Sequence, residues 1–209
     1  MSFEHWLAFA IASAILVAIP GPTVLLVISH ALSHGRRAAL ATVSGVALGD
    51  LTAMTASMLG LGVLLQTTAA LFVVLKTIGA IYLIYLGVKL WRAPTGFASL
   101  DVEAADTRSW RIFAHAYAVT ALNPKSIIFF VAFVPQFLDL HQPMPMQMSI
   151  YIATFVALAV LNAGGYGLMA ALARRTIRRP VVQKWVNRTG GSLLIAAGLF
   201  TLSWRRLPA

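Results

Sequence analysis

Two prolines and a glycine interrupt the first apolar stretch of the sequence, at Pro20, Gly21 and Pro22. A proline inside a helix has no N–H and crowds the carbonyl four residues earlier, so these two leave the carbonyls of Leu16 and Ala18 without helical partners. Within a lipid bilayer, each unpartnered carbonyl is costly unless protein, water or a ligand supplies a donor. The break is therefore a candidate binding position.

A later apolar stretch has its own break, where Asn123 and Pro124 precede Lys125. Paired interruptions at corresponding positions of two halves of a chain point to a substrate site near the bilayer midplane, where the N-termini of half-helices attract an anionic group. The alternative is a structural kink, whose freed backbone groups neighbouring helices satisfy. Such kinks are common at single prolines, whereas a Pro-Gly-Pro matched by an Asn-Pro-Lys favours a substrate site.

Three ionisable residues lie within apolar stretches, namely Asp50, Lys76 and Lys125. Such a group costs at least ~2.5 kcal/mol at the bilayer centre and faces the interior of a bundle or a water-filled cavity. Asp50 is predicted to bind a substrate ammonium or to carry a coupling proton, the alternative being a structural ion pair with either lysine. Lys125 would attract a carboxylate or act as a fixed counter-charge. Lys76 would line the site or extend outward to the interface.

Asn162 and Tyr166 add polar groups to an apolar, Gly-rich stretch. Asn162 is a further candidate site residue, and the alternative for both is hydrogen bonding between packed helices. No metal site is expected, because the histidines are scattered at loops and span ends, and only His30 and His34 have the i, i+4 spacing of helical ligands. These histidines are His30, His34, His115 and His141. Neither a G-x-S-x-G motif nor a P-loop is present, so the chain is predicted to be no enzyme and to need no cofactor.

The composition is that of a membrane protein: of 209 residues, 59% are hydrophobic and 11% are charged, and the mean hydropathy is +0.83. A soluble domain would carry about 25% charged residues. The net charge of +10 does not indicate nucleic-acid binding, because Lys and Arg gather in short loops beside apolar spans. Cysteine is absent, which excludes disulfides and thiolate metal sites.

Six apolar spans are predicted to be transmembrane helices, because a barrel would need alternating strands of about ten residues. The spans cover residues 3–29, 38–65, 69–91, 112–138, 146–172 and 189–204. The first span is too long for a cleaved signal peptide and follows an acidic start, so it is expected to remain. The predicted fold is an all-α integral membrane protein with six helices in contact with lipid.

The distribution of positive charge predicts the orientation of the bundle. The first, third and fifth connections carry twelve of the sixteen Lys and Arg residues, and the second and fourth carry none. Lys and Arg mark cytoplasmic loops, so these three connections are expected in the cytoplasm and both termini outside. Arg205 and Arg206 then stand on the unexpected side, but they are outnumbered.

The sequence repeats itself weakly, with one three-helix unit over 1–92, a cytoplasmic linker over 93–110 and a second unit over 111–209. A unit of three spans is odd in number, so the second must enter the membrane from the opposite face, as in transporters with inverted repeats. The alternative is coincidence, since Gly-rich faces also serve simple helix packing and are compatible with a homodimer. The matched pairs are Gly79 with Gly190, Gly87 with Gly198, Asp50 with Asn162, and Pro22 with Pro124.

These motifs together resemble the LysE/RhtB family of amino-acid exporters. The resemblance rests on "IPGPTVLLVISHALSHGRRAALATVSGVALGD", "LKTIGAIYLIYLGVKLWR" and "ALNPKSIIFFVAFVPQFL", in that order and spacing. Ile19 and Pro20 stand where the family often has Gly-Pro, a departure that leaves the break intact. The resemblance implies a small permease of the bacterial inner membrane that exports neutral or basic amino acids, such as threonine, homoserine, leucine or lysine, by proton exchange.

The expected function is export of a small zwitterionic amino acid by alternating access between the two repeats. The two breaks would shape a central site, Lys125 would assist the substrate carboxylate, and Asp50 would take the ammonium or the proton. The alternatives are a carrier or channel for another small solute or cation, and a membrane scaffold that transports nothing and whose buried charges are structural.

Overall fold

The computed structural model describes residues 2–19, 21–65, 69–93, 108–139, 142–172 and 180–203, and these contain helices but no strands. This confirms the predicted all-helical character. The elements are α1 (Phe3–Ala18), α2 (Pro22–Leu65), α3 (Ala69–Trp91), α4 (Ser109–Ala121), α5 (Pro124–Ala132), the short 3-10 helix η2 (Val134–Phe137), α6 (Met144–Leu172) and α8 (Pro180–Ser203).

Between two and four segments of the described chain are long and apolar enough to cross a membrane. Two of them are continuous helices, Ala38–Gly60 within α2 and Met144–Ala170 within α6. The other two are bent pairs: α1 joins Pro22–Ala31 of α2 at 57°, and α4 joins Pro124–Phe137 at 41°. By length and composition, therefore, the described helices support fewer spans than the six predicted.

The remaining two predicted spans correspond to α3 and α8. Among the described residues of α3, the apolar helical segment is Thr77–Trp91, which is too short to be a candidate span by itself. Helix α8 begins at Pro180, nine residues before the predicted start at 189, so Lys184 and Arg188 lie on the helix rather than in a connection. Similarly, α4 begins at Ser109, before the predicted boundary, and most of the linker predicted over 93–110 lies outside the described residues.

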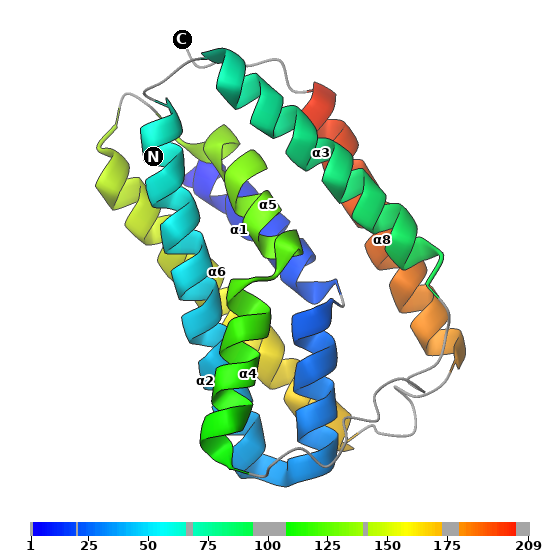
Figure 1. Ribbon diagram of the computed structural model, residues 1–209. Coiled ribbons are helices and arrows are strands. Elements are labelled where there is room, and N and C mark those ends of the chain that lie inside the picture. The colour runs from blue at the N-terminus through cyan, green and yellow to red at the C-terminus, as the bar shows by residue number, and fades with distance from the viewer. Residues whose placement is uncertain are drawn as a thin grey trace.

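Helix α2 turns back on itself between its two straight parts (Figure 1). Val27 from the first part and Val46 from the second pack in one buried cluster with Ala163 of α6. A hydrogen bond of 2.9 Å joins His30 Nδ1 to Thr42 Oγ1. Since the Thr42 hydroxyl already donates to the carbonyl of Ala38 at 2.8 Å, the imidazole is the donor. The first part of α2 is thereby fixed against the second.

The two bent pairs run in opposite directions and bring their breaks together at mid-height (Figure 1). Helix α1 descends from the upper end of the molecule, whereas α4 rises from the lower end. The start of α1 and the end of α8 lie at the same, upper end. Helices α3 and α8 lie side by side along one flank.

Glycines allow α3 and α8 to approach each other closely. A Cβ at Gly87 would lie 2.6 Å from the carbonyl oxygen of Gly191, and a Cβ at Gly191 would lie 2.6 Å from the carbonyl of Gly87. A Cβ at Gly198 would similarly be 2.7 Å from the carbonyl of Ala80. These backbones meet at distances that exclude any side chain, which is the small-residue packing known for membrane helices.

We expect Gly87→Ala to lower the stability of the protein by about 1–3 kcal/mol, because the methyl group must push two backbones apart. Gly164→Ala on α6 is the matched control, since no described atom lies within 4 Å of that Cβ position. The control should be neutral, or stabilising by about 0.5–1 kcal/mol through helix propensity. Thermal unfolding in detergent measures both, and equal midpoints for the two variants would contradict the close α3–α8 contact.

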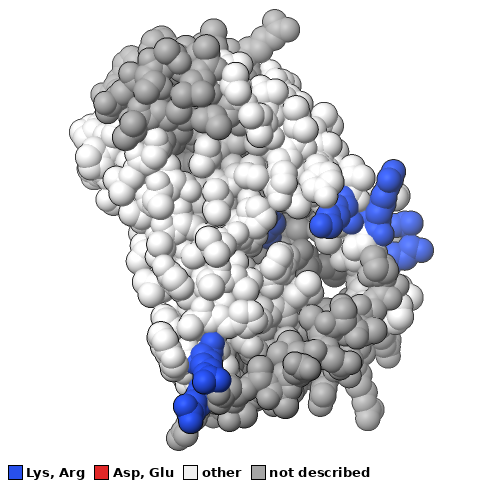
Figure 2. All heavy atoms as spheres, viewed as in Figure 1, with Lys and Arg blue, Asp and Glu red and all other residues white. Residues whose placement is uncertain are grey.

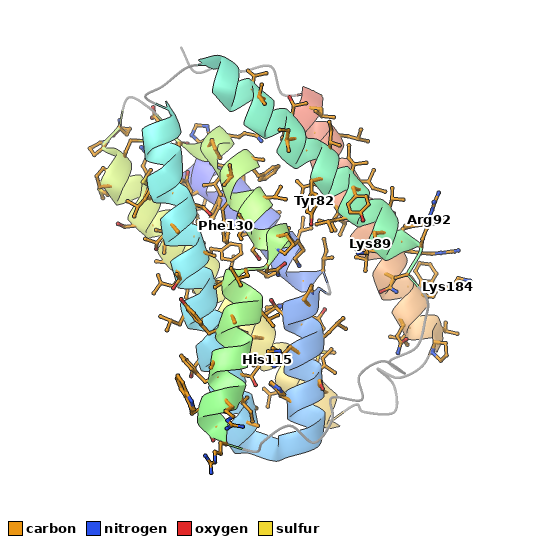
Figure 3. All side chains as sticks on the ribbon, viewed as in Figure 1. Tyr82, Lys89, Arg92, His115, Phe130 and Lys184 are labelled. Carbon is orange, nitrogen blue, oxygen red and sulfur yellow. The ribbon has the colours of Figure 1, made fainter. Side chains whose placement is uncertain are left out.

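Aromatic side chains pack α1, α5 and α6 together above the breaks (Figure 3). Phe130 meets Phe155 edge to face at 4.7 Å between centroids, and Phe9 meets Tyr151 at 4.5 Å. All four are fully buried. The Tyr151 hydroxyl donates to the carbonyl of Phe137 at 2.7 Å, so a polar contact is satisfied within this cluster. The cluster holds α5 in place directly after its break.

Candidate functional site

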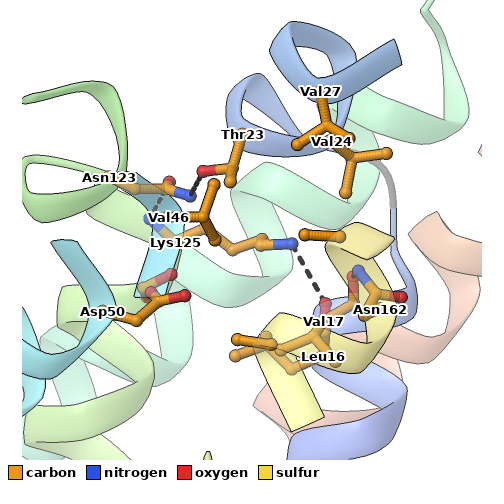
Figure 4. A pocket seen from close by; sticks show the side chains of 13 residues that line it. Leu16, Val17, Thr23, Val24, Val27, Val46, Asp50, Asn123, Lys125 and Asn162 are labelled. Atoms are coloured by element: carbon orange, nitrogen blue, oxygen red, sulfur yellow. Dashed lines mark hydrogen bonds between the residues drawn. The ribbon is translucent and has the colours of Figure 1, made fainter. Parts of the chain in front are cut away.

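A small pocket of about 30 Å³ lies where the two breaks meet (Figure 4). Its walls come from both bent pairs, from the second part of α2 and from α6. Its polar lining residues are Thr23, Asp50, Asn123, Lys125, Ser126 and Asn162. A volume of this size holds about one water molecule. The walls are therefore in close contact around a buried polar centre.

The structure brings four of the predicted site residues into this pocket, namely Asp50, Asn123, Lys125 and Asn162. Pro22 and Pro124 are the first residues of α2 and α5. That is the position where a proline costs least, because its missing N–H would have no helical acceptor. Gly21 lies beside the Lys125 side chain. Two predicted site residues cannot be compared with the pocket. Pro20 lies outside the described residues, and Lys76 belongs to α3 by its backbone but its side chain is not described.

Lys125 reaches from the start of α5 to the end of α1. Its Nζ donates to the carbonyl oxygens of Leu16, at 3.0 Å, and Ile19, at 2.8 Å. The side chain is 9% exposed, and a Cβ at Gly21 would lie 3.4 Å from the same nitrogen. The C-terminal end of a helix carries partial negative charge, which a cation stabilises. Lys125 thus gives the carbonyl of Leu16 a donor in addition to the backbone N–H of Ile19, which donates to it at 3.2 Å.

Two side chains of α6 donate hydrogen bonds to the two carbonyls between Leu16 and Ile19. Asn162 Nδ2 donates to Val17 at 2.9 Å, and the Tyr166 hydroxyl donates to Ala18 at 2.8 Å. Together with Lys125, these residues supply donors to all four carbonyls at the end of α1. Tyr166 was singled out in the sequence only as a polar residue in an apolar span, so its contact with the break is a finding of the structure.

We expect Tyr166→Phe to lower stability by about 0.5–1.5 kcal/mol, the usual net contribution of one hydrogen bond, because its contact with the exposed Ala18 is lost. Tyr85→Phe is the matched control, because Tyr85 lies 55% exposed on α3, away from the breaks. Thermal unfolding of both variants in detergent checks this prediction. An unchanged midpoint for Tyr166→Phe would show that the contact with Ala18 contributes nothing to the end of α1.

The second break is fixed by Asn123. Its side-chain oxygen accepts from the backbone N–H of Lys125 at 3.1 Å, which caps the N-terminus of α5. Its Nδ2 donates to Thr23 Oγ1 at 3.3 Å, and the Thr23 hydroxyl shares a further hydrogen bond of 3.3 Å with Thr120. This chain of contacts joins the first turn of α2 to the end of α4. Neither threonine was predicted from the sequence as a site residue, although each lies within three residues of a break.

Asp50 lies on the second part of α2 and lines the pocket opposite Asn162 (Figure 4). Its side chain is 4% exposed. Within the described chain, no side chain forms a hydrogen bond or a salt bridge with its carboxylate, and Lys125 is bound to carbonyls instead. A buried carboxylate that accepts no hydrogen bond from a described side chain is unfavourable as an anion, so it favours a proton or a cationic ligand.

The structure also brings two histidines together that are far apart in the sequence. The ring of His115 on α4, labelled in Figure 3, lies 6.1 Å between centroids from the ring of His30 on α2. Where the chain is described, no group of three His, Cys, Asp or Glu side chains lies close enough together to hold a metal ion.

Similarity to known proteins identifies the family. The model of the LysE type translocator family matches residues 14–204. The chain belongs to this family. The homoserine/homoserine lactone efflux proteins of Salmonella typhimurium and Salmonella typhi are each 33% identical to it, over 98% of this chain and 99% of theirs. An uncharacterized membrane protein of Vibrio cholerae is 31% identical over 95% of this chain and 97% of its own. No solved structure matches the chain.

The family confirms the resemblance inferred from the sequence motifs. This LysE type translocator is a multi-pass membrane protein that acts in transport and efflux, and its family is one of translocators rather than enzymes. The buried pocket at the crossed breaks is its candidate transport site.

Proposed function

We propose that this translocator exports a small zwitterionic amino acid, of the threonine, homoserine, leucine or lysine class, across the bacterial inner membrane in exchange for protons. The observation that carries the proposal is a buried carboxylate, Asp50, which forms no hydrogen bond or salt bridge with a described side chain and lines a pocket formed by two crossed helix breaks. The names of the two Salmonella relatives, both homoserine/homoserine lactone efflux proteins, support an amino-acid substrate.

The pocket offers complementary groups for the two charges of a zwitterion. Asp50 supplies a carboxylate for the ammonium or takes up the exchanged proton. Thr23 and Val24 lie in the first turn of α2, where backbone N–H groups have no acceptor within the helix and favour an anionic carboxylate. Lys125 adds a positive charge from the opposite break. Because the pocket holds about one water molecule, substrate entry requires the two bent pairs to move apart.

We further propose that the chain forms six spans in two inverted three-helix repeats, 1–92 and 111–209. Each repeat would begin with a bent pair whose second helix starts at a proline, Pro22 or Pro124. The opposite directions of α1 and α4 support the inversion (Figure 1). Movement of one repeat against the other would expose the pocket alternately to the two sides of the membrane.

The positive charges support an orientation with both termini outside. On the face shown in Figure 2, the described Lys and Arg side chains gather at the end of α3 and the start of α8, and at the start of α4. No acidic side chain is visible among the described atoms of that face. These residues would border the cytoplasm, as would the linker over 93–110.

Counterflow in proteoliposomes tests the proposed function. Vesicles loaded with an unlabelled amino acid should take up the same labelled amino acid faster than empty vesicles do, and an imposed proton gradient should drive net movement. Homoserine, threonine, leucine and lysine are assayed in turn, with protein-free vesicles as the control. Counterflow of another solute class would favour the alternative carrier, and the absence of counterflow and of any ligand-dependent thermal shift would favour a scaffold.

A further inference from the structure

The end of α1 already holds a primary ammonium group, that of Lys125. The Nζ atom donates to the carbonyls of Leu16 and Ile19, at 3.0 and 2.8 Å. Both oxygens are at the negative end of a half-helix inside the membrane region, and such ends coordinate cations in other transporters. An ammonium has three donors and no acceptor, so a pair of carbonyls matches its chemistry.

Only two of the four carbonyls at this end are available to a cation. The carbonyls of Val17 and Ala18 already accept hydrogen bonds from Asn162 and Tyr166, which leaves the carbonyls of Leu16 and Ile19. These donors come from α6, whereas Lys125 comes from α5. The carbonyls of Leu16 and Ile19 therefore form a separate receptor. Lys125 is the described side chain that donates to both, and the carbonyl of Leu16 also accepts from the backbone N–H of Ile19 at 3.2 Å.

We propose that this carbonyl pair is a binding site for primary ammonium groups, which Lys125 fills in the empty carrier and the ammonium of the substrate fills during transport. The proposal rests on the proposed function of amino-acid export. Lys125 and the substrate present the same chemical group, and both belong to one pocket, which is too small to hold them together in this conformation. Lys125 acts as a tethered substitute for the substrate.

The structure allows the lysine to leave. Its ammonium is held on a flexible four-carbon stem, and that stem lies against Gly21, which has no side chain to trap it: a Cβ there would be 3.4 Å from Nζ and 3.6 Å from Cε. Asp50 lines the same pocket and forms no hydrogen bond with any described side chain. A displaced Lys125 therefore has a carboxylate near it, either that of Asp50 or that of the arriving substrate.

This arrangement determines how the empty carrier returns. If no cation filled the carbonyl pair after substrate release, the buried carbonyl of Ile19 would lose its donor and the carbonyl of Leu16 would keep only the backbone N–H of Ile19. That loss would cost free energy during the return movement through the membrane. Lys125 removes that cost, so the carrier returns without substrate and export is net. Without Lys125, the carrier would return only with a second substrate molecule and would exchange rather than export.

Paired flux assays in proteoliposomes test the proposal, with the substrate that counterflow identifies. For each variant, net efflux into substrate-free buffer and exchange against external substrate are measured. In Lys125→Gln both rates should fall, because the lysine also assists the carboxylate, but the ratio of net efflux to exchange should fall by at least about tenfold, as expected when a charge-assisted contact is lost. Lys89→Gln, an exposed lysine near the end of α3, is the matched control and should keep the wild-type ratio.

Chemical rescue separates the ammonium role from a structural one. In Lys125→Ala, added ethylammonium should raise the ratio of net efflux to exchange, since it can occupy the carbonyl pair. An unchanged ratio in Lys125→Gln, or no rescue by ethylammonium, would overturn the proposal. The wild-type rates of net efflux and exchange test the proposal even if a variant fails to insert. A wild-type protein that exchanges substrate but shows no net efflux would contradict the proposal. A wild-type protein with neither flux would instead refute the proposed function.

Discussion

Replacement of Asp50 by Asn is expected to reduce export by about 100-fold or more, because leaving a buried charge without its partner costs about 3–5 kcal/mol and each 1.4 kcal/mol corresponds to about tenfold. The amide has nearly the same shape as the carboxylate, but it can neither neutralise an ammonium nor take up a proton. Counterflow and proton-driven efflux in proteoliposomes measure the loss. The thermal midpoint of the empty protein should not fall, because Asn removes a buried charge that forms no hydrogen bond or salt bridge with a described side chain.

Glu4→Gln provides the control for this prediction. Glu4 is an exposed carboxylate in the first turn of α1, remote in sequence from the break. Its replacement should leave export within about twofold of the wild type, since substitutions at exposed positions have small effects. If the Asp50 variant inserts correctly and still exports at the wild-type rate, Asp50 has no part in binding or coupling and the assigned site is wrong.

Pro22→Ala is expected to slow export by about 10- to 100-fold, because a small displacement of the binding groups is enough for such a loss. Alanine at this position has an N–H that would reach the carbonyl of Ala18 in a continuous helix. That carbonyl is now bound by the hydroxyl of Tyr166, so a continuous helix would compete with this contact. The first turn of α2, with Thr23 in the pocket, would shift as the bend of 57° opens.

Pro180→Ala is the matched control for the proline. Pro180 is also the first residue of its helix, α8, but it is exposed and does not line the pocket. Its replacement should leave export unchanged, because a first-turn proline sacrifices no helical hydrogen bond. Equal export rates for the two proline variants and the wild type would mean that the first break is a simple structural kink.

The positions of the two breaks were predictable from sequence because proline acts locally. Pro22 and Pro124 lack an N–H wherever they occur, and each begins a helix in the structure. The burial of Asp50 followed equally from its place in an apolar stretch. The helical fold and membrane character depended on hydropathy, a property of the sequence itself. Helix α8 was the least well predicted, because its first turns are polar and only its later part is apolar.

The partners of the broken helix were beyond the reach of sequence. The side chains that donate to residues 16–19 come from positions more than 100 residues away, and their match depends on how α1, α5 and α6 pack. The same packing placed the Lys125 ammonium on the carbonyls of Leu16 and Ile19, a contact that the sequence did not predict. It also brought Thr23 to Asn123 and Thr120.

Sequence by itself therefore determined which groups would be costly inside the membrane: the freed carbonyls, the buried acid and the buried lysine. These costs arise from covalent structure and from the hydrophobic setting, so they can be identified along the chain. Only the tertiary structure determined which donor binds which buried acceptor. A hydrogen bond requires a distance of about 3 Å, here between segments that are remote in sequence. In this protein the packing of the helices placed Lys125 at the end of α1 and left Asp50 in the pocket without a hydrogen bond or salt bridge to a described side chain.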